Sequence, residues 1–199
     1  MSYTDDEGRL AVEIAREALD AFVEHRPMQS FRVTASFEAK AGAFVTLNEH
    51  PSGELRGCIG YPEPLFPLLK SVVKGAEGVA QDPRFPPLAV DELGRVTVEV
   101  SLLTPPRELE VKKPRELPKF VRVGQDGLII AQGANRGVLL PQVAVEWKWD
   151  AEEFLSEACV KAGLLPDAWF EPMTRVKTFQ SEIFAEAKPR GPVGRRTLG

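Results

Sequence analysis

The sequence predicts an α+β fold in which two half-repeats of hairpin, helix and strand build one largely antiparallel sheet. Three observations lead to this prediction. Strand patterns are joined by short polar turns, without the regular alternation of strand and helix that is typical of parallel sheets. Two helix patterns each have a single apolar face. The order hairpin, helix, strand occurs twice along the 199 residues, a length that suits one domain or two small lobes sharing a core.

The first element is an amphipathic helix at the N-terminus. Thr4 and Glu7 have the spacing of a capping box, in which Thr4 is the N-cap and Glu7 reaches back to it. Four apolar residues follow at four-residue spacing, and we expect the helix to run to about Glu24 and to end before Pro27. The apolar positions are Leu10, Ile14, Ala18 and Phe22.

A hairpin opens the first half-repeat, which we expect to span roughly residues 28–105. Residues 42–48 and 54–61 are rich in β-forming side chains. The segment between them contains Pro51 and Gly53, which are residue types that mark turns.

A helix and a strand complete this half-repeat. Apolar residues between 65 and 80 recur with the period of an α-helix. The helix is expected to stop at Asp82, because the residue before a proline is driven out of the helical backbone conformation. Residues 96–103 alternate in hydrophobicity, which predicts a strand with one buried face.

The second half-repeat, expected at roughly 120–187, follows a charged connector at 104–118 that contains four prolines. It begins with two segments that resemble the first hairpin and again carry an Arg-Gly pair. The matching segments are 126–131 with 41–46, and 135–140 with 55–60. A helix capped by Asp150 and closed by Gly163 follows, and then a strand at 176–185. This order suggests an ancient duplication.

We expect one domain at residues 1–187 and a basic tail at residues 188–199. The tail contains four basic residues and no acidic one, so the body of the protein is more acidic than the whole chain. A basic segment of this kind can contact RNA or an acidic partner, fray, or dock on the acidic body. The sequence leaves these alternatives open.

Charge and composition exclude several classes of protein. Lys and Arg total 25, and Asp and Glu total 29, giving a formal net charge of −4 that disfavours nucleic-acid binding. The N-terminus is acidic and no apolar run has the length of a membrane span, which indicates a cytoplasmic protein without membrane contact. Two cysteines and two histidines without ligand spacing indicate no disulfide scaffold, no metal site and no cofactor.

The candidate site centres on the second strand of the first hairpin. Alternation along this strand places Arg56 and Cys58 on one face. Glu99 and Ser101 lie on the polar face of a later strand, and they join the same surface if the two strands pair. A guanidinium beside a thiol favours the thiolate, so one interpretation makes Cys58 a nucleophile or redox group. The other makes Cys58 a small buried hydrophobe and pairs Arg56 with Glu99.

A rigid proline-bearing segment, residues 82–87, supplies further candidate binding residues. Asp82 and Arg84 can pair with each other or bind a carboxylate or phosphate of a ligand. Phe85 lies between prolines, either as a platform for a ligand or as a plug in the core. In the second half-repeat, Lys161 near the end of the helix is the remaining candidate.

These segments resemble the AMMECR domain family, in its stand-alone archaeal and bacterial form. The resemblance runs from about residue 5 to the end of the chain. Its most specific motif is the hexapeptide Leu55-Arg56-Gly57-Cys58-Ile59-Gly60. The other matching segments are 42–47, 82–88, 98–101, 103–106, 137–143 and 161–164.

The resemblance implies a fold but no reaction. The family fold is α+β with a barrel-like sheet and two packed lobes of unequal size, and its hexapeptide lies by a groove regarded as the functional site. No biochemical activity is established for the family. Prokaryotic relatives occur beside, or fused to, a Memo-type protein and a radical-SAM protein, so the resemblance implies these two as partners.

Three functional hypotheses follow from the residues and the resemblance. The first is a cytosolic enzyme, or enzyme component, whose groove around Arg56 and Cys58 binds an anionic small molecule or peptide, with Cys58 as nucleophile or redox group. The second is a non-catalytic adaptor whose groove receives a segment of a Memo-type or radical-SAM partner. The third is nucleic-acid binding through the tail, which the acidic body disfavours.

Overall fold

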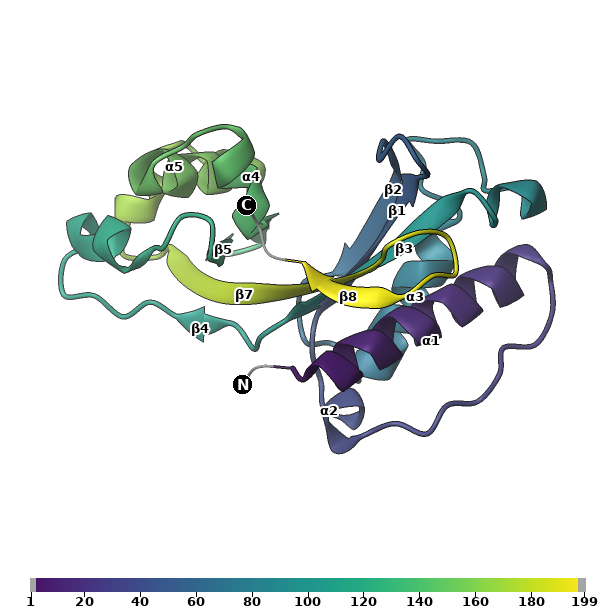
Figure 1. Cartoon of the computed structure of the whole chain (residues 1–199). Coiled ribbons are helices and arrows are strands. Elements are labelled where there is room, and N and C mark those ends of the chain that lie inside the picture. Colours follow the sequence, from purple (N-terminus) through teal and green to yellow (C-terminus); the bar gives the residue numbers. More distant parts are fainter. Residues whose placement is uncertain (1–2, 197–199) are drawn as a thin grey trace. The chain divides into compact units, whose positions relative to one another are not determined.

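The chain forms two compact units, drawn in Figure 1 from a computed structural model that describes residues 3–196. Within these residues, unit 1 comprises 3–103 and 182–196, and unit 2 comprises 104–181. Unit 2 is therefore inserted into unit 1 along the chain. Among the described residues, no helix combines the length and the apolar character that crossing a membrane requires.

Unit 1 is a sheet covered by helices. Its helices are α1 (Asp5–Val23), α2 (Ala35–Glu38), α3 (Leu68–Val79) and the 3-10 helix η1 (Val90–Glu92). Its strands are β1 (Ala43–Glu49), β2 (Leu55–Tyr61), β3 (Val96–Leu103), β8 (Val193–Arg196) and the C-terminal end of β7 (Arg175–Glu186). The strand order is β2-β1-β3-β7-β8. The pairs β1/β2, β1/β3 and β7/β8 are antiparallel.

The first helix is capped as the sequence predicts. The Glu7 backbone N–H donates to Thr4 Oγ1 at 3.2 Å, and the Glu7 carboxylate accepts from the Thr4 backbone N–H at 2.9 Å. These two bonds satisfy donors that the start of a helix leaves without partners. The helix ends at Val23, one residue before the predicted boundary.

The helices α1 and α3 pack against the strands of unit 1 (Figure 1). The strand residues that form the core alternate as predicted, with Val45 and Leu47 of β1 and Val98 and Val100 of β3 completely buried. Because successive side chains point to opposite faces of a sheet, the residues between them lie on the other face. We call this other face of β2, β1 and β3 the outer face, and it carries the candidate site.

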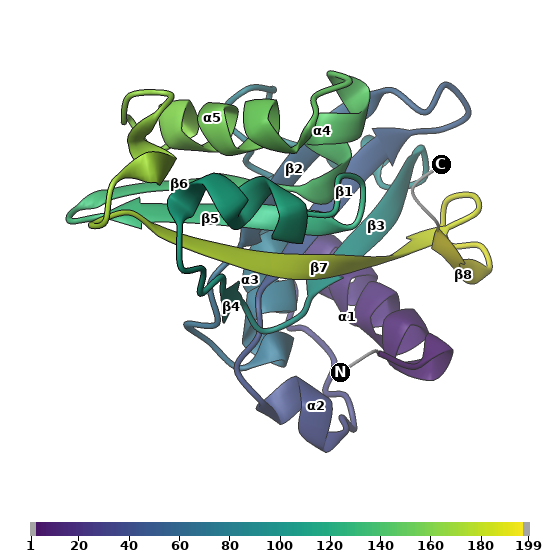
Figure 2. The same cartoon turned by 90° about the vertical axis from the view of Figure 1, so that its left-hand side faces the viewer.

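Unit 2 repeats this plan (Figure 2). Its elements are β4 (Arg107–Glu108), the 3-10 helices η2 (Pro114–Phe120) and η3 (Ala168–Phe170), β5 (Asp126–Gln132), β6 (Asn135–Leu139), α4 (Pro141–Glu146), α5 (Ala151–Lys161) and the first part of β7. β5 pairs antiparallel with β6 and β7, and β4 pairs antiparallel with β7. Phe154 and Leu155 of α5 join Leu128 and Ile130 of β5 in a core of their own. The short helix α4 is not among the predicted elements.

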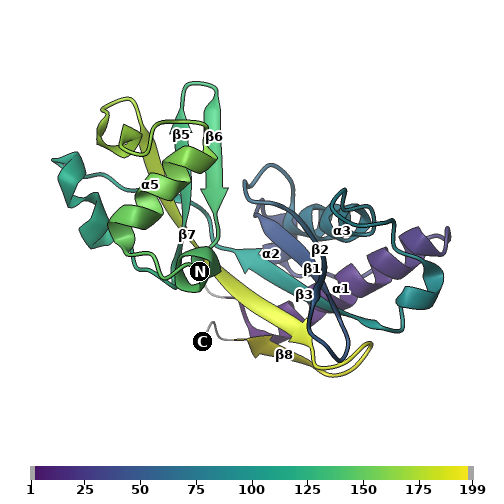
Figure 3. The same cartoon turned by 90° about the horizontal axis from the view of Figure 1, so that it is seen from above.

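The predicted order of hairpin, helix and strand occurs in both units, and each helix lies along its hairpin (Figure 3). In both copies the glycine of the Arg-Gly pair lies against the end of the helix. A Cβ on Gly57 would come within 2.9 Å of Val79 Cγ2. A Cβ on Gly137 would lie 2.4 Å from the Ala162 nitrogen and 2.8 Å from the Ala158 carbonyl oxygen. Only glycine allows the helix to approach the strand this closely.

The first strands of the two copies align differently from the sequence match. Gly57 pairs with Leu47 and Gly137 pairs with Ile130, so Ile130 corresponds to Leu47 and not to Val45. A shift of two residues along a strand keeps each side chain on the same face. The burial pattern therefore survives the correction.

The segment expected as a basic tail belongs to unit 1 as far as it is described. β8 pairs with β7, and three arginines of the segment bond to acidic residues of the same unit. The pairs are Arg190 with Asp20, Arg195 with Asp5, and Arg196 with Glu99. Among the alternatives, these contacts agree with docking on the acidic body. Positions 197–199 of the expected tail lie outside the described residues.

We predict that Gly137→Ala lowers the free energy of unfolding by about 2 kcal/mol, because the added Cβ would meet fixed backbone atoms of α5 and the overpacked helix must shift. Denaturant unfolding followed by circular dichroism measures the change. Gly94→Ala is the matched control, since nothing lies within 4 Å of its Cβ position, and it should be neutral or slightly stabilising. Equal stability of the two variants would contradict the close approach.

Candidate functional site

A row of three side chains crosses the outer face. Thr46 of β1 pairs with Cys58 of β2 on one side and with Glu99 of β3 on the other. The three side chains therefore stand next to one another. Direct pairing of the strands that carry Cys58 and Glu99, which the sequence analysis considers, is wrong, because β1 lies between them. Thr46 is a site residue that sequence reasoning missed, and the signal for it is a polar side chain between Val45 and Leu47 in an otherwise apolar strand pattern.

Ser101 belongs to the next row of the outer face. Phe44 pairs with Gly60 on one side and with Ser101 on the other. A Cβ on Gly60 would lie 2.4 Å from the Phe44 ring, so the ring extends over the glycine. Ser101 is buried. It shares the face of Cys58 but is less accessible to a ligand.

The Cys58 thiol is stabilised in its neutral form. Thr46 Oγ1 donates a hydrogen bond to Cys58 Sγ at 3.3 Å. Burial is the main effect, and it raises the pKa of the Cys58 thiol above its ordinary value. The Thr46 hydrogen bond and the Arg84 charge lower this pKa, but they do not offset the burial. The surroundings therefore oppose the activated thiolate that one interpretation of the sequence requires.

Arg56 bonds to other partners than the thiol. Its Nε and Nη2 donate to the two Glu92 carboxylate oxygens at 2.8 and 3.1 Å, and Nη2 also donates to the Pro86 carbonyl at 2.9 Å. These bonds hold the pKa of Glu92 below its ordinary value. Glu99, the partner that the sequence suggests for Arg56, accepts from Arg196 at 2.9 Å. Arg56 therefore connects β2 to the loop that follows α3.

Asp82 and Arg84 form a clamp on the outer edge of β2. The Cys58 backbone N–H donates to Asp82 Oδ2 at 2.9 Å, and Arg84 Nη2 donates to the Cys58 carbonyl at 3.1 Å. The two side chains also bond each other, with Arg84 Nη2 2.6 Å from Asp82 Oδ2 and Nε 3.0 Å from Oδ1. This edge clamp satisfies the strand backbone as a further strand would.

The edge clamp fixes the charge states of its members. The Arg84 guanidinium is the main cause that holds the pKa of the Asp82 carboxyl well below its usual range, and the Cys58 N–H contributes. Phe85 completes the arrangement, with the Arg56 and Arg84 guanidiniums each 5.7 Å from its ring centroid. The ring thus supports two cations of the chain itself.

Lys161 is not among the residues that unit 1 brings together. It is the exposed last residue of α5 in unit 2, and its role stays a prediction. In the part of the chain that the structure describes, no cluster of three or more His, Cys, Asp or Glu side chains is placed to hold a metal ion.

Two features define a class of small α+β proteins. One is the order of hairpin, helix and strand that occurs twice, and the other is the clamped strand Leu-Arg-Gly-Cys-Ile-Gly in the first copy. The chain belongs to the AMMECR1 family, whose model matches residues 12–184. This confirms the family that the sequence motifs indicate.

Relatives from archaea match nearly the whole chain. Protein PF1979 of Pyrococcus furiosus is 48% identical over 202 residues, covering 98% of this chain and 95% of the relative. A protein of Methanothermobacter thermautotrophicus is 51% identical over 187 residues, covering 91% and 95%. The crystal structure of the uncharacterized protein PH0010 from Pyrococcus horikoshii is 45% identical and covers 98% of both chains with a TM-score of 0.87. This likeness confirms the mixed fold with its curled antiparallel sheet, and none of these names states an activity.

We predict that iodoacetamide modifies Cys58 faster than Cys159, and that Cys58 is a neutral thiol at pH 7 that reacts only through its small thiolate fraction. Cys58 is partly exposed, whereas Cys159 is buried and its pKa is raised to about 11 by that burial. Below its pKa, the rate at Cys58 should rise about tenfold for each pH unit, because the thiolate is the reacting species. Peptide mass spectrometry between pH 6 and pH 10 follows both sites. A rate at Cys58 that does not change between pH 6 and pH 8 would mean a thiolate already formed.

We predict that Asp82→Asn lowers the free energy of unfolding at pH 7 by about 2–4 kcal/mol, because a buried, bonded carboxylate loses its charge. The folded-state pKa of Asp82 lies below the unfolded value of about 4, so its stabilisation is complete above that value. It is lost as the pH falls through the folded-state pKa.

The difference between the wild type and Asp82→Asn should therefore shrink as the pH is lowered from 5, which urea unfolding at several pH values measures. Asp91→Asn is the matched control, since Asp91 and Arg95 form an exposed ion pair that contributes less than about 0.5 kcal/mol. A loss at Asp82 as small as that at Asp91 would refute the edge clamp as a stabilising contact.

Proposed function

We propose that the protein is a cytosolic enzyme component that binds an anionic group, of a small molecule or a peptide, on the outer face beside Cys58. The observation that supports this function is the Arg84 guanidinium, which is anchored within the chain and yet partly exposed. Its side chain is 56% exposed, although Nε and Nη2 are anchored by Asp82 and the Cys58 carbonyl. Its Nη1 makes no hydrogen bond to any described residue. A guanidinium that is held in place but open on one side is preorganised to bind a carboxylate or phosphate.

The neighbours of Arg84 fit a binding role. Thr46, Cys58 and Gly60 carry small side chains or none, and they are half-buried on the same face. Arg56 acts as a positioning residue, because its guanidinium is bound to Glu92 and lies against Phe85 rather than being free for a ligand. In this function Cys58 packs and accepts a hydrogen bond, and no thiolate is needed.

A catalytic role for Cys58 is the second candidate. Two contacts favour it, since the Thr46 hydrogen bond and the Arg84 charge both lower the pKa of the thiol. Against it stands the stronger effect of burial, which keeps the proton on sulfur at neutral pH. Fast alkylation of Cys58 at pH 7 would favour this candidate over binding alone.

The anionic group can also belong to a protein partner. The resemblance to the AMMECR domain family points to a Memo-type or a radical-SAM protein, and a carboxylate of such a partner suits Arg84. The edge clamp occupies the backbone N–H and carbonyl of Cys58 in β2. A segment of the partner would therefore bind through a side chain or a chain terminus, and not by adding a strand at this edge. Nucleic-acid binding ranks last, because Arg190, Arg195 and Arg196 already bond to acidic residues.

We predict that phosphate and the peptide acetyl-Gly-Gly, with its free carboxylate, shift the amide signals of Thr46, Cys58 and Arg84 in ¹H–¹⁵N NMR titrations. Arg84→Ala should weaken this binding at least about tenfold, because a charge-assisted hydrogen bond contributes ~1.5–3 kcal/mol.

Arg95→Ala is the matched control, since Arg95 is an exposed arginine of unit 1 that also pairs with an aspartate. It should bind both probes as the wild type does. Circular dichroism must show that Arg84→Ala is folded before the comparison is made. Equal weakening by the two variants, or shifts spread over the whole surface, would indicate unspecific attraction by charge and refute the site.

A further inference from the structure

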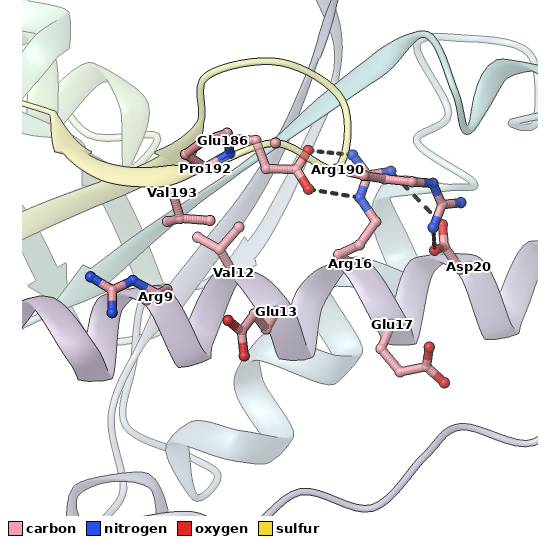
Figure 4. Close-up of a pocket in the computed structure, with 11 residues that line it drawn as sticks. Arg9, Val12, Glu13, Arg16, Glu17, Asp20, Glu186, Arg190, Pro192 and Val193 are labelled. Carbon is pink, nitrogen blue, oxygen red and sulfur yellow. Dashed lines mark hydrogen bonds and ion pairs between the residues drawn. The ribbon is translucent and has the colours of Figure 1, made fainter.

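Unit 1 contains a second polar site that shares no residue with the site around Cys58. A cavity of about 600 Å³ lies between α1 and the loop that joins β7 to β8 (Figure 4). Four carboxylates and three guanidiniums line it, so the lining carries more acidic than basic groups. Arg16 and Asp20 project into it from α1, and Glu186 and Arg190 approach from the opposite side (Figure 4).

The Arg16 side chain at the base of the cavity makes four hydrogen bonds within the chain. Its Nε donates to Glu186 Oε1 at 3.0 Å, and its Nη2 donates to the other Glu186 oxygen. The Val96 carbonyl accepts from Nη2 at 2.8 Å, and the Leu93 carbonyl accepts from Nη1 at 3.2 Å. Both charged side chains are buried. Arg16 and Glu186 thus form a neutral, bonded pair that offers little to a ligand.

Asp20 differs from its neighbours, because one of its oxygens has no hydrogen bond. The residue is 3% exposed. Its Oδ2 accepts from Arg190 Nη1 at 2.6 Å, whereas its buried Oδ1 has no hydrogen-bond partner. Arg16 Nη1 lies 3.8 Å from Oδ1, which is too long for a hydrogen bond. Burial raises the pKa of Asp20, which agrees with a carboxylate that lacks a donor.

Arg190 is a half-exposed occupant of this site, held by one hydrogen bond to Asp20. It lies in the loop between β7 and β8 with a φ of 56°, a backbone conformation that residues other than glycine rarely adopt. Its side chain is 52% exposed. It gives Asp20 one hydrogen bond, although a guanidinium can bind a carboxylate through two parallel bonds. The site therefore binds the Arg190 guanidinium through only one of the two Asp20 oxygens.

We infer that this cavity is a binding site for a guanidinium group, carried by a small molecule or by an arginine of a peptide, which binds both oxygens of Asp20 in place of Arg190. A bidentate ligand would supply the donor that Oδ1 lacks. Arg26 binds both oxygens of Glu17 on the wall, so the acidic groups that favour a cation are Asp20 and the exposed Glu13. The volume lies in the ordinary range of ligand sites, ~300–1,000 Å³. Arg190 is the internal competitor, so ligand binding and docking of its loop exclude each other.

Isothermal titration calorimetry with butylguanidine tests this site on the full chain. The Arg190 side chain blocks Asp20 whenever it is bound there. The variant Arg190→Ala should therefore bind butylguanidine at least about tenfold more tightly than the wild type does. Arg175→Ala is the matched control, because Arg175 is an exposed arginine with a single carboxylate partner, Glu108, in unit 2. It should bind as the wild type does.

The uncharged isostere butylurea distinguishes a carboxylate site from an ordinary cavity without any change to Asp20. It should bind Arg190→Ala at least about tenfold more weakly than butylguanidine, because it cannot form a charged pair. Asp20→Asn, if circular dichroism shows it folded, should abolish the preference for butylguanidine. The peptide acetyl-Gly-Arg-Gly-amide identifies the source of the group: tighter binding than butylguanidine assigns a peptide, and weaker binding assigns a small molecule.

Two results would overturn the inference. One is the absence of saturable butylguanidine binding to Arg190→Ala at millimolar concentration, which would mean that water alone satisfies Asp20 Oδ1. The other is equal binding of butylguanidine and butylurea.

Discussion

The hydrogen bond from the Cys58 backbone N–H to Asp82 is the contact on which the rest of the site depends. Asp82 lies three residues after the end of α3, and its carboxylate closes the edge of the neighbouring strand. It also holds Arg84, and through Arg84 and Phe85 it connects to Arg56. The positions of the charged side chains beside the outer face therefore depend on the hydrogen bonds that Asp82 and Arg84 make to the backbone of Cys58.

The duplicated plan shows which features are structural and which are particular to one half. The close approach of helix to glycine occurs at both Gly57 and Gly137, so it belongs to the packing of the half-repeat. The Asp-Pro-Arg-Phe segment follows α3 only, and nothing like it follows α5 in the sequence. The two Arg-Gly arginines have diverged accordingly: Arg56 is buried beside this segment, whereas Arg136 is exposed. A binding role for the first half alone is consistent with this difference.

Local signals in the sequence were sufficient for the long helices and strands, but not for α4, for β8 or for the long-range pairing of strands. The capping box of Thr4 and Glu7 and the alternation of residues 96–103 depend on neighbours along the chain, and both are confirmed. The position of Thr46 between two strands depends on which edges meet, which no local period encodes. The hydrogen bond between Arg16 and Glu186 joins residues 170 positions apart. From sequence alone, Arg16 is indistinguishable from any other charged residue on a helix.

The insertion of unit 2 into unit 1 has a consequence for the order in which the protein can be completed during synthesis. The first 103 residues leave the ribosome with Arg16 and Asp20 facing the future core, while their partners Glu186 and Arg190 are still to be made. Until the last strand pair arrives, Arg16 and Asp20 lack the hydrogen bonds to Glu186 and Arg190, and each has only the other as a counter-ion, at 3.8 Å. A chain that ends before β7 and β8 therefore lacks the hydrogen bonds that hold Arg16 and Asp20 in the finished fold.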